Sequence, residues 1–484
     1  MSAEHRRIGI LREFASLPLM IALLLVRSVE AYVPGDPWSL TASGSTNGEG
    51  NPITLTWSIV PDNTSIFGGD NSNLVSYLDG IFDPISTSWL PLFEQSFDRW
   101  SQLGGITFVR QSTDDGSLLQ LSSGVLGVRG DVRLGGMFDD GPGGTLAFAN
   151  LPNDGDIVFD TGETTFFSNA SGNYLQLRNT LMHEIGHAFG LFHVVSTTNQ
   201  LLLEPFIGTS FDGPQLDDIR GIHGLYGDAL EKTNGGLGND AFSLATSLGA
   251  ITAGSNVSIG DDAASGQFVG ANETDFVSIA NSSDADFYSF SVSDPSTLQV
   301  TLTPWGGIFN QGVEFGEQSV FDANSRNNLS LTVLGTNGVS VLGLADNTAA
   351  GGVESLANLS LTTSGQYFVR VQGADDSVQL YDLQLSATLA SSGLAGDFDD
   401  DQNVDGHDLL VWQNSFGLSG NGLAADGNGD GNVNGSDLQI WEENFGSSGS
   451  LSGILGVPEP TSGMMWSIAL ILKIYGSGHW RRLL

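Results

Sequence analysis

Three histidines and one glutamate lie within eleven consecutive residues of this chain. His183 and His187 are four positions apart, so a helix would present both imidazoles on one face, where they can grip a single ion. Glu184 would then lie close to that ion without being forced to ligate it. Gly190 permits a left-handed turn after the helix, which would bring the chain back to supply His193 as a third ligand.

Three neutral imidazoles with a free fourth position form the ligand set of a catalytic zinc rather than a structural one. Zinc held in this way lowers the pKa of water and polarises a carbonyl, and Glu184 would carry the proton to a leaving amine. On a peptide, this chemistry is amide hydrolysis without a covalent intermediate. The short His-Glu-x-x-His pattern occurs by chance, but the extended form with Gly190 and His193 rarely does, so we expect one functional zinc here.

The elements that must position these residues follow from hydrophobic spacing. Leu181, Ile185 and Phe189 recur at helical intervals, which predicts a helix from about 175 to 189 that Gly190 ends. Aromatic residues at similar spacing indicate an earlier helix, and alternating residues on either side of it indicate strands. The helix residues are Trp89, Phe93, Phe97 and Trp100, and the strands are Ile53–Ile59 and 106–109. Residues 51–228 are therefore predicted to form one domain of mixed α and β structure.

Composition excludes several classes of protein. The 484 residues exceed what one ordinary core holds, so several domains are expected. Asp and Glu total 55 against 16 Lys and Arg, which argues against nucleic-acid binding because such binding needs a basic surface. The sequence has no cysteine, so disulfides and thiolate metal sites are excluded. In so acidic a chain without disulfides, we expect bound calcium to stabilise the fold, although a solvated acidic surface explains the charge equally well.

Around its histidines the chain resembles a metzincin metallopeptidase, and more closely the matrixin family of matrix metallopeptidases. Several further segments carry the resemblance in the right order: residues 97–100, 140–147, 155–160, Glu163, 217–222 and 225–227. The resemblance implies an α+β, zincin-like catalytic domain over residues 51–228 that cleaves protein or peptide substrates. It also implies that His183, His187 and His193 hold one zinc and that Glu184 is the catalytic residue.

The same resemblance implies a calcium site in the catalytic domain. Its ligands would be the side chains of Asp140, Asp160 and Glu163 and the backbone carbonyls of Gly141, Gly143 and Thr145. Several carboxylates around a Gly-rich turn suit calcium, which prefers oxygen ligands. An ordinary Gly-Pro turn with exposed acids is the alternative for this loop.

Three features depart from the matrixin pattern. Phe148 and Val158 stand where the family has histidines for a second, structural zinc, so we expect no structural zinc. Leu203 stands where the family places a methionine in a tight turn beneath the catalytic zinc. Without a cysteine, the family's cysteine-based latency is excluded, and any latency needs another device.

Residues 240–390 are predicted to form a β-sandwich, joined to the catalytic domain by a linker at 229–239. Short alternating runs are separated here by Ser, Thr, Asn and Gly. The stretches 286–290 and 365–371 resemble the bacterial pre-peptidase C-terminal domain. A generic β-sandwich fits the same pattern, and we find no catalytic constellation in it.

Two Asp-rich repeats within residues 395–446 resemble the type I dockerin, a small α-helical calcium-binding domain. Each repeat has EF-hand-like ligands at loop positions 1, 3, 5, 7, 9 and 12, followed by a short helical pattern. These residues are Asp397, Asp399, Asp401, Asn403, Asp405 and Asp408, then Asp426, Asn428, Asp430, Asn432, Asn434 and Asp437. Gln402 replaces the usual glycine at position 6 of the first loop. The resemblance implies calcium and a cohesin-like partner, and a solvated acidic linker is the alternative.

Both ends of the chain carry targeting patterns. Residues 1–31 have the basic, apolar and small-residue order of a secretory signal peptide, and residues 32–50 read as a linker. In residues 447–484 the motif Val457-Pro458-Glu459-Pro460, an apolar stretch and terminal arginines resemble a PEP-CTERM sorting signal. We therefore expect contact with export and sorting machinery. The protein would be secreted, at the cell envelope or outside it, with the C-terminal segment as a transient membrane anchor.

Two hypotheses for function remain at this stage. The first is a secreted or cell-surface zinc endopeptidase with calcium-dependent accessory modules. The second is a surface or matrix binding protein whose metallopeptidase fold has lost its activity. The absent structural zinc site and Leu203 favour the second hypothesis. Glu184 favours the first, because a mere binding site needs no carboxylate beside its metal.

Overall fold

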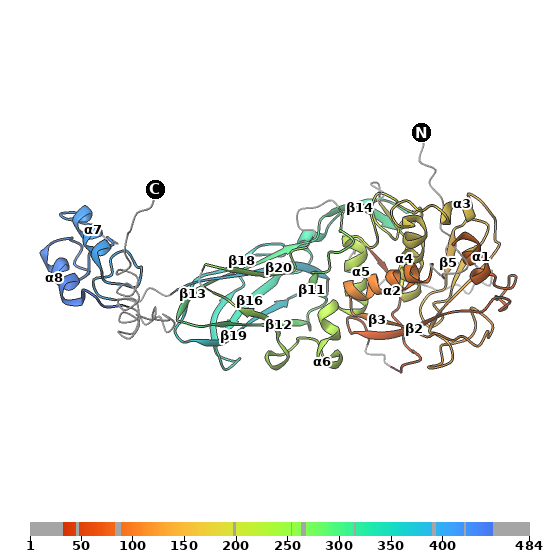
Figure 1. Ribbon diagram of the computed structural model, residues 1–484, viewed down its shortest axis with the longest axis horizontal. Helices are drawn as coiled ribbons and strands as arrows, with labels where there is room; N and C mark the ends of the chain where they lie inside the picture. The colour runs from red at the N-terminus through yellow and green to blue at the C-terminus, as the bar shows by residue number, and fades with distance from the viewer. Residues whose placement is uncertain are drawn as a thin grey trace, which may run out of the picture. The chain divides into compact units, whose positions relative to one another are not determined.

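The computed structural model describes residues 32–44, 48–82, 89–196, 200–252, 254–262, 268–313, 316–389, 394–420 and 423–448. The predicted signal peptide and the predicted sorting segment from residue 449 onward lie outside these residues. The chain divides into two compact units, Met1–Ala390 and Ser391–Leu484, which are described separately (Figure 1). Among the described residues, no helix is both long enough and apolar enough to cross a membrane.

The N-terminal part of the first unit is built on a five-stranded sheet with strand order β3-β2-β4-β6-β5. The strands are β2 (Ile53–Ile59), β3 (Ile106–Arg110), β4 (Val132–Met137), β5 (Ala147–Ala149) and β6 (Ile157–Asp160). Neighbouring strands are parallel except β5, which runs antiparallel to β6 at the edge. All residues of β4 are buried, as expected for a central strand whose two faces are covered.

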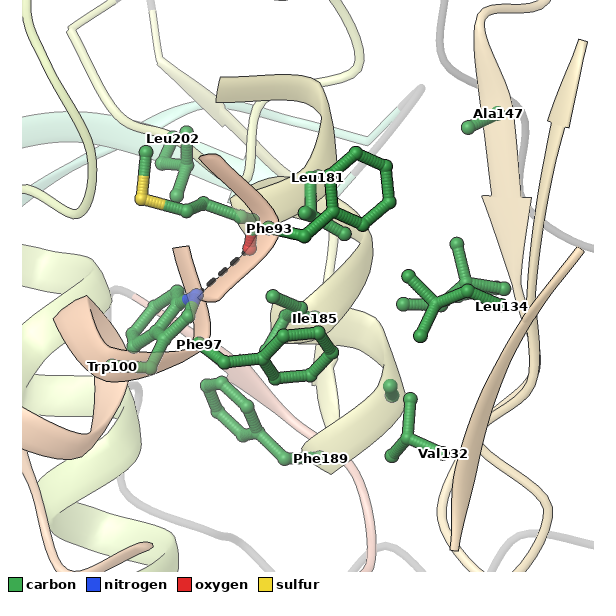
Figure 2. Packing of buried hydrophobic residues seen from close by; sticks show 14 of the residues in the cluster. Phe93, Phe97, Trp100, Val132, Leu134, Ala147, Leu181, Ile185, Phe189 and Leu202 are labelled. Carbon is green, nitrogen blue, oxygen red and sulfur yellow. Dashed lines mark hydrogen bonds between the residues drawn. The ribbon is translucent and has the colours of Figure 1, made fainter. Parts of the chain in front are cut away.

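The helices of this region are α1 (Leu74–Ile81), α2 (Leu90–Leu103), α3 (Thr164–Phe167), α4 (Leu175–Phe189) and α5 (Leu216–Tyr226). Of these, α1, α2 and α4 contact strands of the sheet, and α3 contacts α4. Figure 2 shows apolar side chains of α2, α4 and β4 meeting in one cluster. Within it, the rings of Trp100 and Phe189 meet edge-on, with their centroids 4.7 Å apart. The Nε1 of Trp100 also donates a hydrogen bond of 2.9 Å to the carbonyl of Met182 (Figure 2). The aromatic stripe of α2 thus fastens it to the helix that carries the histidines.

Two short strand pairs flank the end of α4. β1 (Val33–Pro34) runs antiparallel to β7 (Leu191–Phe192), just after the helix. β8 (Val194–Ser196) begins directly after His193 and pairs with β14 (Ile308–Val313), which comes from the following region of the chain. β14 in turn pairs with β15 (Ser319–Asp322).

The rest of the first unit is a sandwich of two five-stranded sheets. One has the order β10-β20-β13-β18 with β11 also on β20, and the other β17-β16-β19-β12-β9. Their strands are β9 (Thr246–Ala250), β10 (Asn256–Ile259), β11 (Val277–Ile279), β12 (Ala285–Val292), β13 (Ser296–Trp305), β16 (Leu329–Leu334), β17 (Val341–Ala345), β18 (Glu354–Leu361), β19 (Gly365–Gly373) and β20 (Gln379–Leu389). Alternate residues point into a shared core, which includes Val300, Leu331 and Leu383.

The region built on the five-stranded sheet, which carries the predicted catalytic residues, and the sandwich share a buried boundary within the first unit. The Arg99 guanidinium of α2 donates to the backbone carbonyls of Gly270 and Glu273. His223 of α5 contacts the hydroxyl of Ser278 at 2.9 Å. A mixed apolar cluster also spans the boundary, formed by Leu103, Ile219, Val269 and Phe276 with Leu216 and Trp305 partly buried beside it. Residues 229–239 hold a 3-10 helix, η1 (Ala229–Lys232), and the short α6 (Thr233–Gly236).

The second unit contains two loops that each lead into a helix, α7 (Gly406–Ser415) and α8 (Gly435–Asn444). A tryptophan from each half donates a hydrogen bond to the other half. Nε1 of Trp412 donates to the carbonyl of Asn434 at 2.9 Å, and Nε1 of Trp441 donates to that of Asp405 at 2.7 Å. This reciprocity follows from the sequence repeat, since matching residues make matching contacts.

Candidate metal centre

Helix α4 and the turn after it bring the three predicted imidazoles together. His183, His187 and His193 are all buried, and one ring nitrogen from each lies within 4.8 Å of the others. Gly190 ends the helix with a φ of 124°, a conformation that a side chain would strain. Its N–H still bonds to the carbonyls of Gly186 and His187, so the helix closes before the chain turns back.

The ring nitrogens are arranged for a metal. Nε2 of His183 lies 2.9 Å from Nε2 of His187 and 3.2 Å from Nε2 of His193. On the far side of the rings, Nδ1 of His183 lies 2.7 Å from the carbonyl of Leu202, and Nδ1 of His187 lies 2.6 Å from that of Leu191. A carbonyl only accepts, so each Nδ1 carries the hydrogen and each Nε2 presents a lone pair to the centre. Tetrahedral zinc at its usual bond length would separate such nitrogens by about 3.4 Å, so the residues fit this ion.

The electrostatics keep these rings in the form that binds metal. Burial lowers the pKa of His183 well below its usual value and that of His187 to about 4. Both rings are therefore neutral at physiological pH. Neutral imidazole is the ligating form, so no proton has to be displaced there.

Glu184 is the unusual residue of the site. Its side chain is buried, and neither carboxylate oxygen has a hydrogen-bond partner in the described structure. Burial raises the pKa of Glu184 well above its usual range. Burying a polar group without a hydrogen bond costs on the order of 2–7 kcal/mol. A purely structural role therefore does not account for the glutamate at this position. Glu184 directly follows His183 in α4, so it lies in the same turn of the helix as the first imidazole.

The turn beneath the histidines is held by a residue that the sequence patterns did not single out for this role. The carboxylate of Asp218 accepts hydrogen bonds from the backbone N–H of Leu202 at 2.8 Å and of Leu203 at 3.1 Å. The N–H of Gln215 also donates to Asp218, at 2.8 Å. Burial raises the pKa of Asp218 to about 6. Because the carbonyl of Leu202 accepts from His183, Asp218 orients the zinc ligand through the turn.

Leu203 lies directly below the helix. A Cβ built on Gly186, which lies between His183 and His187, would be 3.0 Å from Cδ1 of Leu203. Leu203 is 2% exposed, so it fills the volume under the site tightly. A side chain at position 186 would require this leucine to shift slightly.

The loop predicted to bind calcium in the catalytic domain is compact. Asp160 accepts hydrogen bonds from the N–H of Asp139 and Gly141, and Glu163 accepts one from Gly143 at 2.5 Å. Asp140 instead bonds to Thr145. Within the described part of the chain, Asp140, Asp160 and Glu163 are not among the trios of acidic or histidine side chains that meet within 4.8 Å. Their carboxylates satisfy backbone amides here, and calcium binding by this loop stays a prediction.

The two positions where the resemblance predicts histidines for a structural zinc carry apolar residues. Phe148 of β5 and Val158 of β6 are directly paired across the two strands. They pack in a small cluster with Val60, Ile66, Leu119 and Met137. Hydrocarbon side chains offer no ligand to a metal.

In the second unit the acidic loops fold as the repeat predicts. Carboxylates of Asp397, Asp399 and Asp408 meet within 4.8 Å of one another. Asp408 closes the first loop by accepting from the N–H of Phe398 and Asp405, and Asp437 closes the second in the same way with Asn428 and Asn434. The other carboxylates accept hydrogen bonds from backbone N–H groups of their own loop: Asp397 from Asp401, Asp401 from Asn403, Asp405 from His407, Asp426 from Asp430 and Gly431, and Asp430 from Asn432. This acidic group indicates calcium.

The two loops differ at position 6, where the first has a glutamine and the second a glycine. Gln402 has a φ of 70° and Gly431, its counterpart, a φ of 81°. Both are in the left-handed region, which glycine adopts freely and glutamine does not. The first loop therefore keeps its shape at a cost in backbone strain.

Comparison with known families matches three parts of the chain. Residues 86–227 match the family model Matrixin, residues 284–373 that of the bacterial pre-peptidase C-terminal domain and residues 395–444 that of the dockerin type I domain. The protein is thus multidomain, with an α+β matrixin catalytic domain, a β-rich pre-peptidase C-terminal domain and a small helical dockerin. The fold class predicted from the sequence is confirmed.

Individual relatives resemble the catalytic region. The hatching enzyme of Paracentrotus lividus is 33% identical over 177 residues, which cover 36% of this chain and 27% of that protein. Matrix metalloproteinase-19 of Mus musculus is 33% identical over 159 residues, 32% of this chain and 28% of that protein. The pre-peptidase C-terminal domain of a collagenase from Bacillus anthracis shares 14% identity, with a TM-score of 0.17, over 30% of this chain and 94% of that structure. The chain spans little more than a quarter of the length of these two sequence relatives.

Proposed function

We propose that this chain, whose N-terminal region is a matrixin-type metallopeptidase domain, is a zinc endopeptidase that hydrolyses peptide bonds of protein substrates. One observation carries the proposal. Glu184 is a buried carboxylate without a partner, placed beside three imidazoles whose lone pairs converge on one point.

In this proposal, the histidines bind the metal and the glutamate transfers the proton. His183, His187 and His193 would hold the ion through Nε2, with the Nδ1 atoms of the first two fixed by backbone carbonyls. A zinc ion there supplies a Lewis acid for the scissile carbonyl and acidifies water. Glu184 accepts the proton of the attacking water and returns it to the leaving amine. Its burial excludes bulk water, so the proton stays near the reacting atoms.

The alternative is a protein that keeps this fold only for binding. The apolar pair Phe148 and Val158 and the leucine at 203 favour it, because both depart from the family pattern. Against it stands the cost of keeping Glu184 ionisable and unpartnered in a buried place, which a binding surface would not need. Leu203 is buried, so it fills the space where the family has a methionine.

The accessory modules indicate which ions and partners the proposed peptidase would bind and where it would act. The dockerin loops would bind calcium and present a docking surface to a cohesin-like partner. The catalytic-domain loop at Asp140, Asp160 and Glu163 would bind a further calcium. With the proposed signal peptide and PEP-CTERM-like segment at its ends, the protein would act outside the cell or at its envelope.

The test compares two variants of the whole mature chain, residues 32–484, because the buried boundary with the sandwich would be exposed in a shorter fragment. Zinc-loaded wild-type protein should cleave casein or gelatin, and Glu184→Gln should be about 10²- to 10⁴-fold slower, the usual contribution of a general base. The control is Glu94→Gln, which removes an exposed carboxylate that pairs with Arg110 on the surface.

Both variants should remain folded at the assay temperature by circular dichroism, so that a loss of activity is not a loss of fold. Equal cleavage by wild type and Glu184→Gln would contradict the proposal. No cleavage by a folded, zinc-loaded wild type would favour the binding protein instead.

A further inference from the structure

His193, the third predicted zinc ligand, lies between two short strands that each pair with a distant segment of the chain. Phe192, just before it, belongs to β7 and pairs with Val33 of β1. Val194, just after it, belongs to β8 and pairs with Val313 of β14. The other two histidines lie within α4, where backbone hydrogen bonds are local. The backbone of His193 is therefore the one that depends on segments far away in the sequence.

The strand that pairs with β8 belongs to a hairpin of the sandwich. β14 and β15 run antiparallel as the β14–β15 hairpin, and β14 lies beside the region that carries α4 (Figure 1). At the base of the hairpin, Nε2 of the fully buried Gln379 in β20 donates to the carbonyls of Trp305 and Ala323, at 2.8 and 3.1 Å. The N–H of Ala323 also donates to the carbonyl of Gly307 at 2.9 Å. The hairpin thus leaves the sandwich in a defined direction.

One face of the hairpin packs on the catalytic region. Phe309 and Phe321 lie opposite each other in the two strands, and Phe309 packs against the main core of the catalytic region. Phe321 is 3% exposed, and the guanidinium of Arg220 in α5 lies 5.0 Å from the centre of its ring. The other face of the hairpin points outward, with Ile308 65% exposed and Val320 75% exposed. The aromatic face therefore holds the hairpin against the region that carries the zinc ligands.

β8 connects the hairpin to the rest of the zinc site. The N–H of Val194 donates to the carbonyl of Leu203 at 3.0 Å. The neighbouring carbonyl, that of Leu202, accepts from Nδ1 of His183. Val194 is 1% exposed, so this strand has little space in which to move without disturbing its neighbours. A shift of the hairpin would therefore move His193 directly and would loosen the turn that orients His183.

We propose that the β14–β15 hairpin positions His193, so that the sandwich contributes to the zinc site instead of forming a separate module. This role rests on the proposed function, because it concerns the ligands of the zinc that the peptidase would use. Groups that orient a metal ligand typically change the affinity for the metal by about 10- to 100-fold. The hairpin acts in this way through the backbone of β8, and its residues are positioning residues rather than catalytic ones.

Gly312 of β14 offers a variant that disturbs this contact. It lies opposite Val195 of β8. A Cβ at position 312 would collide with the backbone carbonyl of Glu317, between the two strands of the hairpin, so alanine must displace the hairpin where it meets β8. The matched control is Gly335→Ala in the same sandwich, where the nearest atom to the added Cβ, in Ser340, is 3.6 Å away. Neither glycine has a positive φ, so the backbone conformation itself accepts alanine at both positions.

The experiment titrates the metal-free mature chain with cobalt(II), with calcium held at saturation. Cobalt(II) occupies zinc sites, and its visible absorption reports the coordination geometry without any need for cleavage. Gly312→Ala should bind cobalt about 10- to 100-fold more weakly than the wild type and show an altered absorption band when saturated. Gly335→Ala should match the wild type in both respects. Equal affinity and an equal absorption band in a folded Gly312→Ala would overturn the proposal.

Hydrogen exchange of the wild type provides a measurement that needs no variant to fold. If the hairpin positions His193, zinc must in return stabilise the hairpin, because coupling between two sites is reciprocal. Zinc should therefore slow exchange of the backbone amides in residues 308–313 as well as in α4. Slower exchange in α4 alone would overturn the proposal. A chain that passes both tests yet cleaves no peptide would contradict the proposed function and support the positioning role.

Discussion

The imidazole site of the catalytic region and the acidic loops of the dockerin unit each gather side chains that can bind a metal ion, but they hold those side chains in different ways. At the imidazole site, ligands are buried, and their outer nitrogens are held by carbonyls of Leu191 and Leu202, so the site is rigid before any metal arrives. In the dockerin loops, Asp408 and Asp437 are buried but the other ligands are exposed or half-buried, and they bond mainly to backbone N–H groups of their own loop. At the first site, one of these carbonyls, that of Leu202, comes from outside the ligand motif, whereas each set of dockerin ligands lies within twelve consecutive residues.

Because the first region depends on buried groups, it should be the more sensitive to changes that affect burial. The largest predicted effect is a loss of its folding stability at low pH. His223 is buried at the boundary with the sandwich, between the carbonyl of Leu103 at 2.7 Å and the hydroxyl of Ser278. Burial lowers its pKa to about 4 from an ordinary value of 6.5. The unfolded chain therefore takes up a proton below pH 6.5 that the folded chain refuses until about pH 4.

It follows that the stability contributed by His223 is present above pH 6.5 and is lost as pH falls, by about 1.4 kcal/mol per pH unit. The measurement is the free energy of unfolding of wild type and His223→Gln by denaturant titration at several pH values. The other buried acids contribute nearly equally to both proteins, so they cancel in the difference. A difference that stays constant from pH 7 to pH 5 would show that His223 is not the group responsible.

A second prediction concerns the rigidity of the imidazole site. Asp218→Asn replaces an oxygen that accepts backbone N–H groups with an amide that cannot accept from all of them, so the turn at Leu202 and Leu203 should loosen. Zinc affinity and cleavage should both fall by about 10- to 100-fold, the usual effect of losing a residue that orients a metal ligand. Affinity is measured by competition with a chromogenic chelator. Asp70→Asn, which removes an exposed carboxylate from another loop, serves as a control, and an equal loss in it would contradict the assignment.

A third prediction asks how closely the space under the histidines is filled. Leu203→Met conserves volume, so it should change stability by less than about 1.5 kcal/mol and leave cleavage within a few-fold of the wild type. Gly186→Ala is the informative partner, because its Cβ would press on Leu203 from 3.0 Å. If the methionine variant were much more active than the wild type, Leu203 would be the cause of a weakened site.

The smallest effect is expected in the dockerin unit. Gln402→Gly should stabilise the first loop by about 1 kcal/mol, because glycine adopts a φ of 70° without strain. Gly431→Gln, the reverse change in the second loop, should destabilise it by a similar amount. Thermal unfolding with and without calcium measures both changes. Equal and negligible shifts would mean that backbone strain does not distinguish the two loops.

The parts predicted from the sequence were those that spacing controls. The helix expected at 175–189 is α4, and the strand expected at Ile53–Ile59 is β2, because each has strong periodicity and clear ends. The three histidines converge because their spacing and Gly190 set a local geometry. The dockerin loops follow from their repeat in the same way.

Contacts between distant segments could not be predicted in this way. Asp218 lies sixteen residues from Leu202, which it holds, and no periodicity links the two. The pairing of β8 with β14 joins residues more than a hundred positions apart. Hydrophobic pattern places residues on a face but does not say which segment will cover that face.

The central claim is that one zinc, held by the three histidines, makes this chain a peptidase. The most direct test titrates the metal-free mature chain with zinc while cleavage of a quenched fluorescent peptide mixture is followed, with calcium held at saturation. The account predicts that cleavage rises in proportion to zinc and levels off at one equivalent per chain, and that His193→Ala shows no such rise. Cleavage that is independent of zinc, or unchanged in His193→Ala, would contradict it.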